Sequence, residues 1–287
     1  MRNFILSAEA ACDLTPELAQ KYGVKIMPMK YYIDGEEYSS DDGKLTTVDI
    51  CEKMKNGAKT ATTQINPSEA EEYLESLLKE GKDVLHLSFS SAMSGTYANF
   101  AAAAEKLNKT HDNKIYVVDT LCQSGGDGLI VTMVAEKSDN DNLDAVAARD
   151  YAESVKLHIV HYFTVDTFTY LARGGRIPAY LATIGNVIKL KPVMHLVNEG
   201  KIVPVKKLIG RKRAIEEVVK NFLENYNGES AHVYICEADC KADAEYVKEQ
   251  IEKAYKNIEV TIMPLGTIIV SHSGPGTLAL FFTADKR

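Results

Sequence analysis

A hydroxyl-rich turn between a buried strand and a helix is the segment of this chain best suited to chemistry. The apolar run Val84–Phe89 is followed by Ser90-Ser91-Ala92-Met93-Ser94-Gly95-Thr96. Ser94 and Thr96 offer hydroxyl donors, and Gly95 lets the backbone come close to a ligand. The helix that follows presents free N–H groups and a partial positive charge at its first turn. The segment therefore predicts a site for a small anion, and the alternative is that Ser94 only caps the helix.

Two further polar segments are candidates for the same site. Thr60-Ala61-Thr62-Thr63-Gln64 stands just before a strong helix start at Asn66, and His272 stands before the turn Gly274-Pro275-Gly276. Taken singly, the first is more typical of a polar loop and the second of a structural histidine.

Several other motifs are excluded. Gly274–Ala279 fits the G-x-G-x-x-A dinucleotide pattern, but only eight residues follow Ala279, too few for the rest of a βαβ unit. No G-x-x-x-x-G-K-[ST] motif occurs. Cys236 and Cys240 have no second pair beside them, so they are expected to be structural thiols rather than metal ligands. His158 and His161, three apart in a predicted strand, should point to opposite faces and are not expected to bind a metal together.

Two arginines stand at conspicuous positions. Arg211 opens the basic group Arg211-Lys212-Arg213 at the start of a predicted helix, where the helix dipole favours acidic residues. Arg176 follows Gly174-Gly175, a turn that can present a guanidinium outward. Both predict contact with a partner or an anion, and the alternative is that each simply pairs with surface acids.

The elements that must position these residues follow two patterns. Up to about residue 155, short apolar strands alternate with helices, which predicts a parallel sheet covered on both faces. Val24–Ile33 is expected to be one of the strands, and Thr15 and Asn66 are expected to cap two of the helices. Beyond it there are two strands for each helix, including a hairpin turning at Asn198-Glu199-Gly200, which suggests a mixed sheet with helices on one face. We therefore predict an α/β fold of two domains, residues 1–160 and 161–287.

Length and composition agree with this organisation. The chain has 287 residues, 45% of them hydrophobic and 25% charged, a mix typical of globular proteins. The net charge of −7 argues against a general nucleic-acid binder. Five scattered cysteines do not form a disulfide framework. There is neither a signal-peptide pattern nor an apolar run of membrane-helix length, so a cytoplasmic protein is expected.

Taken together, these segments resemble the DegV family of fatty-acid-binding proteins. No single motif identifies the family, but the whole set of motifs in this order is specific to it. One departure is Glu9-Ala10, which stands where the family usually has Asp-Ser ahead of the residues matching Asp13-Leu14. The matching segments run in the family's order along the chain: Thr62-Thr63-Gln64 with Pro67-Ser68, Ser90-Ser91 with Ser94-Gly95-Thr96-Tyr97, Asp119-Thr120, Gly174-Gly175-Arg176-Ile177, Lys191-Pro192, and His272 with Gly274-Pro275-Gly276.

The resemblance implies a function in fatty acid metabolism or lipid transport. A tunnel between the two domains would hold a long-chain fatty acid, such as palmitate or oleate. Its carboxylate would meet the Thr62-Thr63 and Ser94-Gly95 motifs, with His272 nearby. Family members carry the acyl group for a separate kinase subunit, which holds ATP and phosphorylates the carboxyl. The chain itself would then need no cofactor and no catalytic residue, and we expect Arg176 and Arg211 at the surface that docks the kinase.

Two alternatives stay open at this point. A hydrolase could use Ser94 as nucleophile and His272 as base, although Ser94 is not in a G-x-S-x-G elbow and no acid is evident to orient the imidazole. A regulatory module that senses lipid and binds another protein would share the ligand and differ only in its partner.

Overall fold

The first half of the molecule is built on a parallel sheet. The computed structural model describes residues 2–184 and 190–287. The sheet has the strand order β2-β1-β6-β7, and all its neighbours are parallel. Every residue of β1 and β6 is buried, as expected of strands covered on both faces. The strands are β1 (Ile5–Glu9), β2 (Val24–Met27), β6 (Val84–Ser88) and β7 (Ile115–Asp119).

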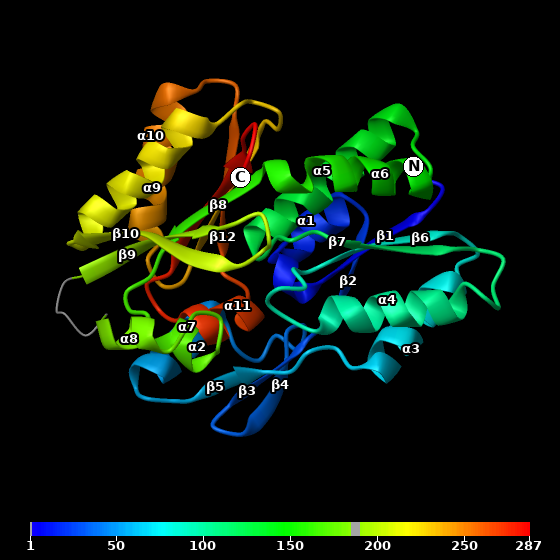
Figure 1. The fold of residues 1–287 in the computed structure, drawn as a ribbon, viewed down its shortest axis with the longest axis horizontal. Helices are drawn as coiled ribbons and strands as arrows, with labels where there is room; N and C mark the ends of the chain where they lie inside the picture. The colour runs from blue at the N-terminus through cyan, green and yellow to red at the C-terminus, as the bar shows by residue number, and fades with distance from the viewer. Residues whose placement is uncertain (1, 185–189) are drawn as a thin grey trace.

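Helices lie on both faces of this sheet, which confirms the predicted arrangement (Figure 1). Helices α3 (Pro67–Leu78) and α4 (Thr96–Leu107) lie below it in the view, and α5 (Gly125–Asp141) and α6 (Ala145–Val155) lie above. The predicted caps form where expected. The Thr15 hydroxyl accepts from Leu18 N ahead of α1 (Pro16–Lys21), and Asn66 forms a capping box with Glu69.

The second half is a six-stranded mixed sheet of order β10-β9-β8-β13-β11-β12. All neighbours are antiparallel except β11 and β12. Helices α9 (Arg211–Asn225) and α10 (Lys241–Ala254) pack on one face. The strands are β8 (Ile159–Thr164), β9 (Leu190–Leu196), β10 (Ile202–Ile209), β11 (His232–Glu237), β12 (Glu259–Pro264) and β13 (Leu278–Thr283).

Helix α5 also covers this second sheet, so the expectation of helices on one face only was wrong. It contacts β8, β11 and β13 as well as α6. The first eleven residues of α5, Gly125–Ala135, are all buried. A helix that is buried all round lies between two layers rather than on a surface.

The predicted strand Val24–Ile33 is divided in the structure. Pro28 has no N–H to continue a ladder, and the chain turns there from β2 into β3 (Lys30–Ile33). Strand β3 belongs to a separate antiparallel sheet, with β4 (Glu36–Ser39) on one side and β5 (Thr60–Thr62) on the other. The segment expected to be a polar loop at residues 60–64 therefore begins as an edge strand.

Several short helices complete the fold. Among them is α11 (Thr267–Ser273), and the sequence patterns predict neither this helix nor the strand β13 that follows it. His158 lies in η2 and His161 in β8, so the two histidines do not share a strand as predicted. The short helices are η1 (Ala10–Cys12), α2 (Thr47–Lys55), η2 (Lys156–His158), α7 (Thr169–Arg173), α8 (Tyr180–Ile184) and α11 (Thr267–Ser273).

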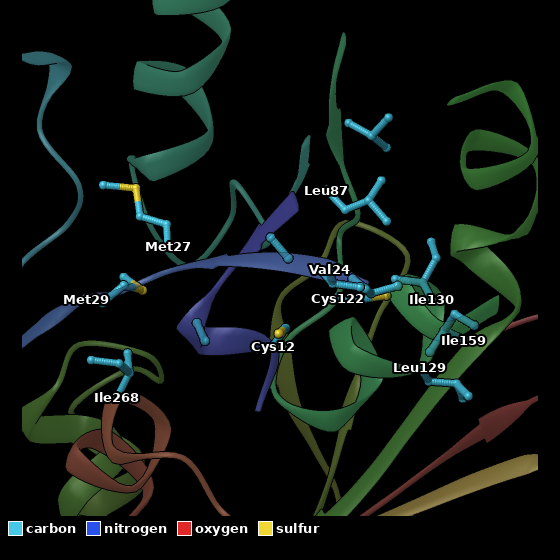
Figure 2. Close-up of a cluster of buried hydrophobic side chains, with 14 of the residues drawn as sticks. Cys12, Val24, Met27, Met29, Leu87, Cys122, Leu129, Ile130, Ile159 and Ile268 are labelled. Carbon is cyan, nitrogen blue, oxygen red and sulfur yellow. The ribbon is translucent and has the colours of Figure 1, made fainter. Parts of the chain in front are cut away.

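The larger of two hydrophobic clusters among the described residues runs through both halves. Figure 2 shows Val24 and Leu87 of the parallel sheet, Leu129 of α5 and Ile159 of β8 in one cluster. Ile159 begins β8 and pairs with Thr283 of β13, so the chain enters the second sheet close to the predicted division. Domain limits of 1–160 and 161–287 stay a prediction. None of the helices in residues 2–184 and 190–287 combines the length and the apolar composition of a membrane span.

Candidate functional site

A cavity lies where the two halves meet. It encloses about 760 Å³ of space between atoms, its open mouth included. Met29 and Phe89 line it from the first half, and Phe163, Leu171 and Phe281 line it from the second. Polar side chains join these apolar walls, among them Thr62, Thr63, Gln64, Ser94, Arg176 and His272.

Thr62 and His272 form a hydrogen-bonded pair in the cavity wall. Thr62 Oγ1 lies 2.7 Å from His272 Nε2, although 210 positions separate them in the sequence. Thr62 ends β5, and His272 stands in the last turn of α11, which packs against β5. A second bond, from Thr60 Oγ1 to Ser271 O at 2.6 Å, holds the two elements in register. The fold thus joins two of the predicted site residues.

His272 is a neutral imidazole. Burial, and secondarily the charge of Arg176, lower the pKa of His272 to about 3. Its buried Nδ1 has no hydrogen-bond partner among the described residues. A Cβ on Gly174 would lie 2.4 Å from this nitrogen, so only glycine leaves room for the ring there.

Ser94 stands in the tight turn that begins α4. Its Oγ accepts from Thr96 N at 3.2 Å and lies 2.9 Å from Thr96 Oγ1. The hydroxyl therefore supports the turn without being the N-cap of α4, which is Gly95, and it also lines the cavity. Gly95 lies beside the cavity, where a Cβ would come within 2.4 Å of Gln64 Oε1.

Glu9 anchors the start of this turn. Its buried carboxylate accepts from Ser88 Oγ at 2.6 Å and from Phe89 N at 3.0 Å. His86 Nε2 lies 3.3 Å from the same carboxylate. The residue that departs from the family's usual Asp thus fastens β1 to the end of β6, directly ahead of the serine-rich turn.

Arg176 is a cavity residue, which the sequence did not indicate. Its guanidinium donates to the Gly174 carbonyl, and its side chain is partly buried in the cavity wall. Desolvation lowers the pKa of Arg176. It supplies the positive charge in a wall whose histidine is neutral, and the signal available was its place two residues after Gly174. Its expected contact with a partner stays a prediction.

Arg211 is held by other parts of the chain. Its Nε donates to Asp243 Oδ2 at 2.9 Å and its Nη1 donates to the Gly276 carbonyl at 2.6 Å. Asp166 Oδ1 lies 3.7 Å from Nη1, and 21% of the side chain is exposed. Arg211 does not line the cavity, and its predicted role in docking a partner stays a prediction.

The geometry does not assemble a hydrolytic triad. His272 Nε2 faces Thr62, while Ser94 Oγ is engaged by Thr96. No acid orients the imidazole among the described residues, because Nδ1 is unpartnered there. In that same part of the chain, no three His, Cys, Asp or Glu side chains are grouped to hold a metal ion. Hydroxyl donors, a guanidinium and apolar walls instead suit an anionic head group with an apolar tail.

Comparison with known proteins agrees with this geometry. The family model described as "Uncharacterised protein, DegV family" matches residues 6–285. A DegV domain-containing protein of Clostridium perfringens is 33% identical over 291 residues, covering 100% of this chain and 99% of the relative. A fatty acid-binding protein of Thermotoga maritima is 28% identical and covers 97% of both chains.

Solved structures show the same fold. A structure described as fatty acid binding of a DegV family protein from Thermus thermophilus has a TM-score of 0.86 at 27% identity, covering 99% of this chain and 100% of that one. A fatty acid binding DegV family protein from Streptococcus agalactiae has a TM-score of 0.85 at 25% identity, with 100% coverage of both. These names describe binding rather than catalysis. On this evidence the chain belongs to the DegV family.

Proposed function

We propose that this protein binds a long-chain fatty acid, such as palmitate or oleate, in the cavity between its halves. The carboxylate lies among Thr62, Ser94, His272 and Arg176, and the acyl chain lies against the apolar walls. The observation that carries the proposal is the convergence of these four side chains, from four separate segments, at one apolar cavity. Relatives described as fatty acid-binding proteins support it.

The physical chemistry favours this ligand. A carboxylate accepts hydrogen bonds from hydroxyls, and a guanidinium beside them strengthens the interaction. An acyl chain of about fifteen methylenes, at about 0.8 kcal/mol each, contributes roughly 12 kcal/mol of gross hydrophobic transfer. Ordering the ligand and the walls offsets much of that gain. The net affinity then needs few polar contacts.

Native mass spectrometry of protein purified from bacteria tests the proposal. We expect a long-chain fatty acid at near-stoichiometric level, identified after extraction. Titration with a fluorescent fatty acid should show that Thr62→Ala and Ser94→Ala each weaken binding, by about 1–3 kcal/mol if the ligand buries the lost donor. Ser91→Ala, an exposed hydroxyl of the same turn, is the matched control. An apo mass together with no uptake of added palmitate or oleate would refute the proposal.

We further propose that the bound carboxylate is presented to a partner fatty acid kinase. The observation behind this is a second, open hollow that shares Thr62, Ser94 and Arg176 with the cavity and leads outward. In a reconstituted two-protein assay with ATP, acyl phosphate should form only when the loaded protein is present. Arg211→Ala should bind fatty acid like the wild type and be phosphorylated more slowly. Phosphorylation at the wild-type rate would remove Arg211 from the docking surface.

A further inference from the structure

The tip of the β9–β10 hairpin is bonded to the serine-rich turn of the other half. Ser90 Oγ donates to the Gly200 carbonyl at 3.1 Å, and 110 positions separate the two residues. Both residues are buried. The hairpin tip is itself closed, because Gly200 N donates to Val197 O at 2.8 Å and Val197 N donates to Lys201 O at 3.0 Å. The bond therefore connects two tight turns rather than two loose loops.

Ser90 is also the base of the turn that presents Ser94. Its carbonyl accepts from Met93 N at 3.0 Å and from Ser94 N at 3.3 Å. Its hydroxyl oxygen accepts from Ala92 N at 3.3 Å. A change in the position of Ser90 is thus transmitted to Ser94 through the backbone.

The hairpin side of the bond also lines the cavity and the hollow outside it. Ile202, two residues beyond Gly200, lines both the cavity and the hollow outside it. In that hollow, residues 201–204 line one part and residues 92–95 another. The Ser90–Gly200 bond joins these two segments near one end.

Position 200 admits only glycine in this arrangement. Gly200 has φ +73°, a left-handed conformation that side chains disfavour. A Cβ there would lie 2.2 Å from Ser90 Oγ and 3.4 Å from Leu121 Cα. The close approach of the hairpin to Ser90 therefore depends on the absence of a side chain.

We propose that Ser90 and Gly200 form a latch that holds the β9–β10 hairpin against the Ser94 turn and so sets how fast a ligand enters and leaves the cavity. Ser90 is a positioning residue in this scheme and does not contact the ligand. The inference rests on the proposed function, since it assigns the latch to a fatty acid held in that cavity.

Ser90→Ala tests the latch, with Ser91→Ala as the matched control in the same turn. In the ligand-free protein, hydrogen–deuterium exchange of residues 197–203 should accelerate in Ser90→Ala and not in Ser91→Ala. After loading with a fluorescent fatty acid and a chase with excess oleate, the dissociation rate constant should rise roughly five- to tenfold in Ser90→Ala, as expected for one lost buried hydrogen bond. Ser91→Ala should stay within twofold of the wild type.

The outcomes separate the latch from the proposed function. Unchanged exchange in Ser90→Ala would overturn the latch itself. Faster exchange with unchanged dissociation would overturn its control of the ligand. If the wild-type protein takes up no fatty acid, the proposed function is wrong. The exchange experiment uses ligand-free protein, so it still tests the latch in that case.

Gly200→Ala gives a second route to the same contact. Its Cβ collides with Ser90 Oγ, so its effect on exchange and dissociation should be larger with Ser90 present than in the Ser90→Ala background. The left-handed strain is the same in both backgrounds and cancels in this comparison. Strictly additive effects of the two substitutions would contradict a direct contact.

Discussion

Charge in the cavity is divided unevenly among its polar residues. His272 is neutral, because burial and Arg176 lower its pKa to about 3. Thr62 and Ser94 contribute dipoles only. Among the described residues that line the cavity, Arg176 therefore carries the fixed positive charge that a bound carboxylate would meet.

Arg176→Ala should weaken binding of a fluorescent fatty acid by roughly 10- to 150-fold, which corresponds to about 1.5–3 kcal/mol for a hydrogen bond to a charged group. Arg176→Lys should restore only part of the affinity, since an ammonium lacks the planar fork of the guanidinium. Proton NMR of the ligand-free variant should also show the pKa of His272 rising. Wild-type affinity in Arg176→Ala would mean that the carboxylate lies elsewhere.

Asp13 gives the molecule a pH dependence of known sign. Burial raises the pKa of Asp13 to about 7, although Ser124 Oγ donates to it at 2.6 Å. Between about pH 4 and 7 the folded protein holds this proton and the unfolded chain does not. The contribution of Asp13 to the free energy of unfolding therefore falls as pH rises through that window, and is constant above it.

Asp13→Asn should remove this dependence. Asparagine tolerates the left-handed backbone at φ +56° and still accepts from Ser124. Relative to the wild type, the free energy of unfolding of the variant should rise by up to about 1.4 kcal/mol per pH unit between pH 4 and 7. His272 acts in the opposite direction, since its lowered pKa makes the free energy of unfolding rise with pH from about 3 to 6.5. Both proteins contain His272, so its contribution cancels when the variant is compared with the wild type. Parallel pH profiles of urea unfolding for the two proteins would contradict the prediction.

At the scale of elements, the site depends on how closely α7 approaches α11. Gly174 ends α7 with an ordinary helical φ of −71°, so its requirement for glycine comes from contact and not from backbone strain. The contact is with the His272 ring. The next residue, Gly175, has φ +74°, and a Cβ there would meet nothing within 4 Å.

These two glycines form a matched pair for a test. Gly174→Ala should displace His272 from Thr62 and weaken fatty acid binding by about 1–3 kcal/mol. Gly175→Ala should lower stability by about 1 kcal/mol through backbone strain and leave the affinity unchanged. Titration with a fluorescent fatty acid measures the affinity of each variant, and thermal melts measure its stability. Equal affinities for the two would show that His272 adapts or that it is not a ligand contact.

At the scale of the whole molecule, the two sheets share the larger of the two buried clusters found among the described residues, and the smaller one lies between the mixed sheet and helices α9 and α10. Leu6 and Leu85 of the parallel sheet belong to the same buried cluster as Phe163, Tyr234 and Phe281 of the mixed sheet. Helix α5 contributes to that cluster and packs on the mixed sheet. Neither half buries its inner face without the other.

We therefore expect one cooperative unfolding transition. Pulse-labelling hydrogen exchange during urea unfolding should give the same midpoint for peptides from β6 and from β11. Phe281→Ala should lower the free energy of unfolding by about 3–5 kcal/mol and shift both midpoints together. Two separate midpoints would show that the halves unfold independently.

The sequence by itself determined much of this protein. Local signals are carried by neighbouring residues, so the caps at Thr15 and Asn66, the parallel sheet of the first half and the hydroxyl-rich turn at Ser94 followed from spacing and residue type. The ordered motifs indicated the DegV family, and that family was confirmed. Pro28 was visible as a strand breaker, yet the strand was predicted across it.

Only the tertiary structure decided which of these residues meet. The Thr62–His272 bond joins segments 210 positions apart, and helical or strand periodicity carries no information over that distance. Arg176 looked like a surface residue because a Gly-Gly turn permits many directions, and the packing around Gly174 selected the cavity. The position of α5 between two sheets likewise depends on partners far along the chain. The residue types and the order of the elements are local properties, whereas the cavity exists only because two sheets close around one helix and share its core.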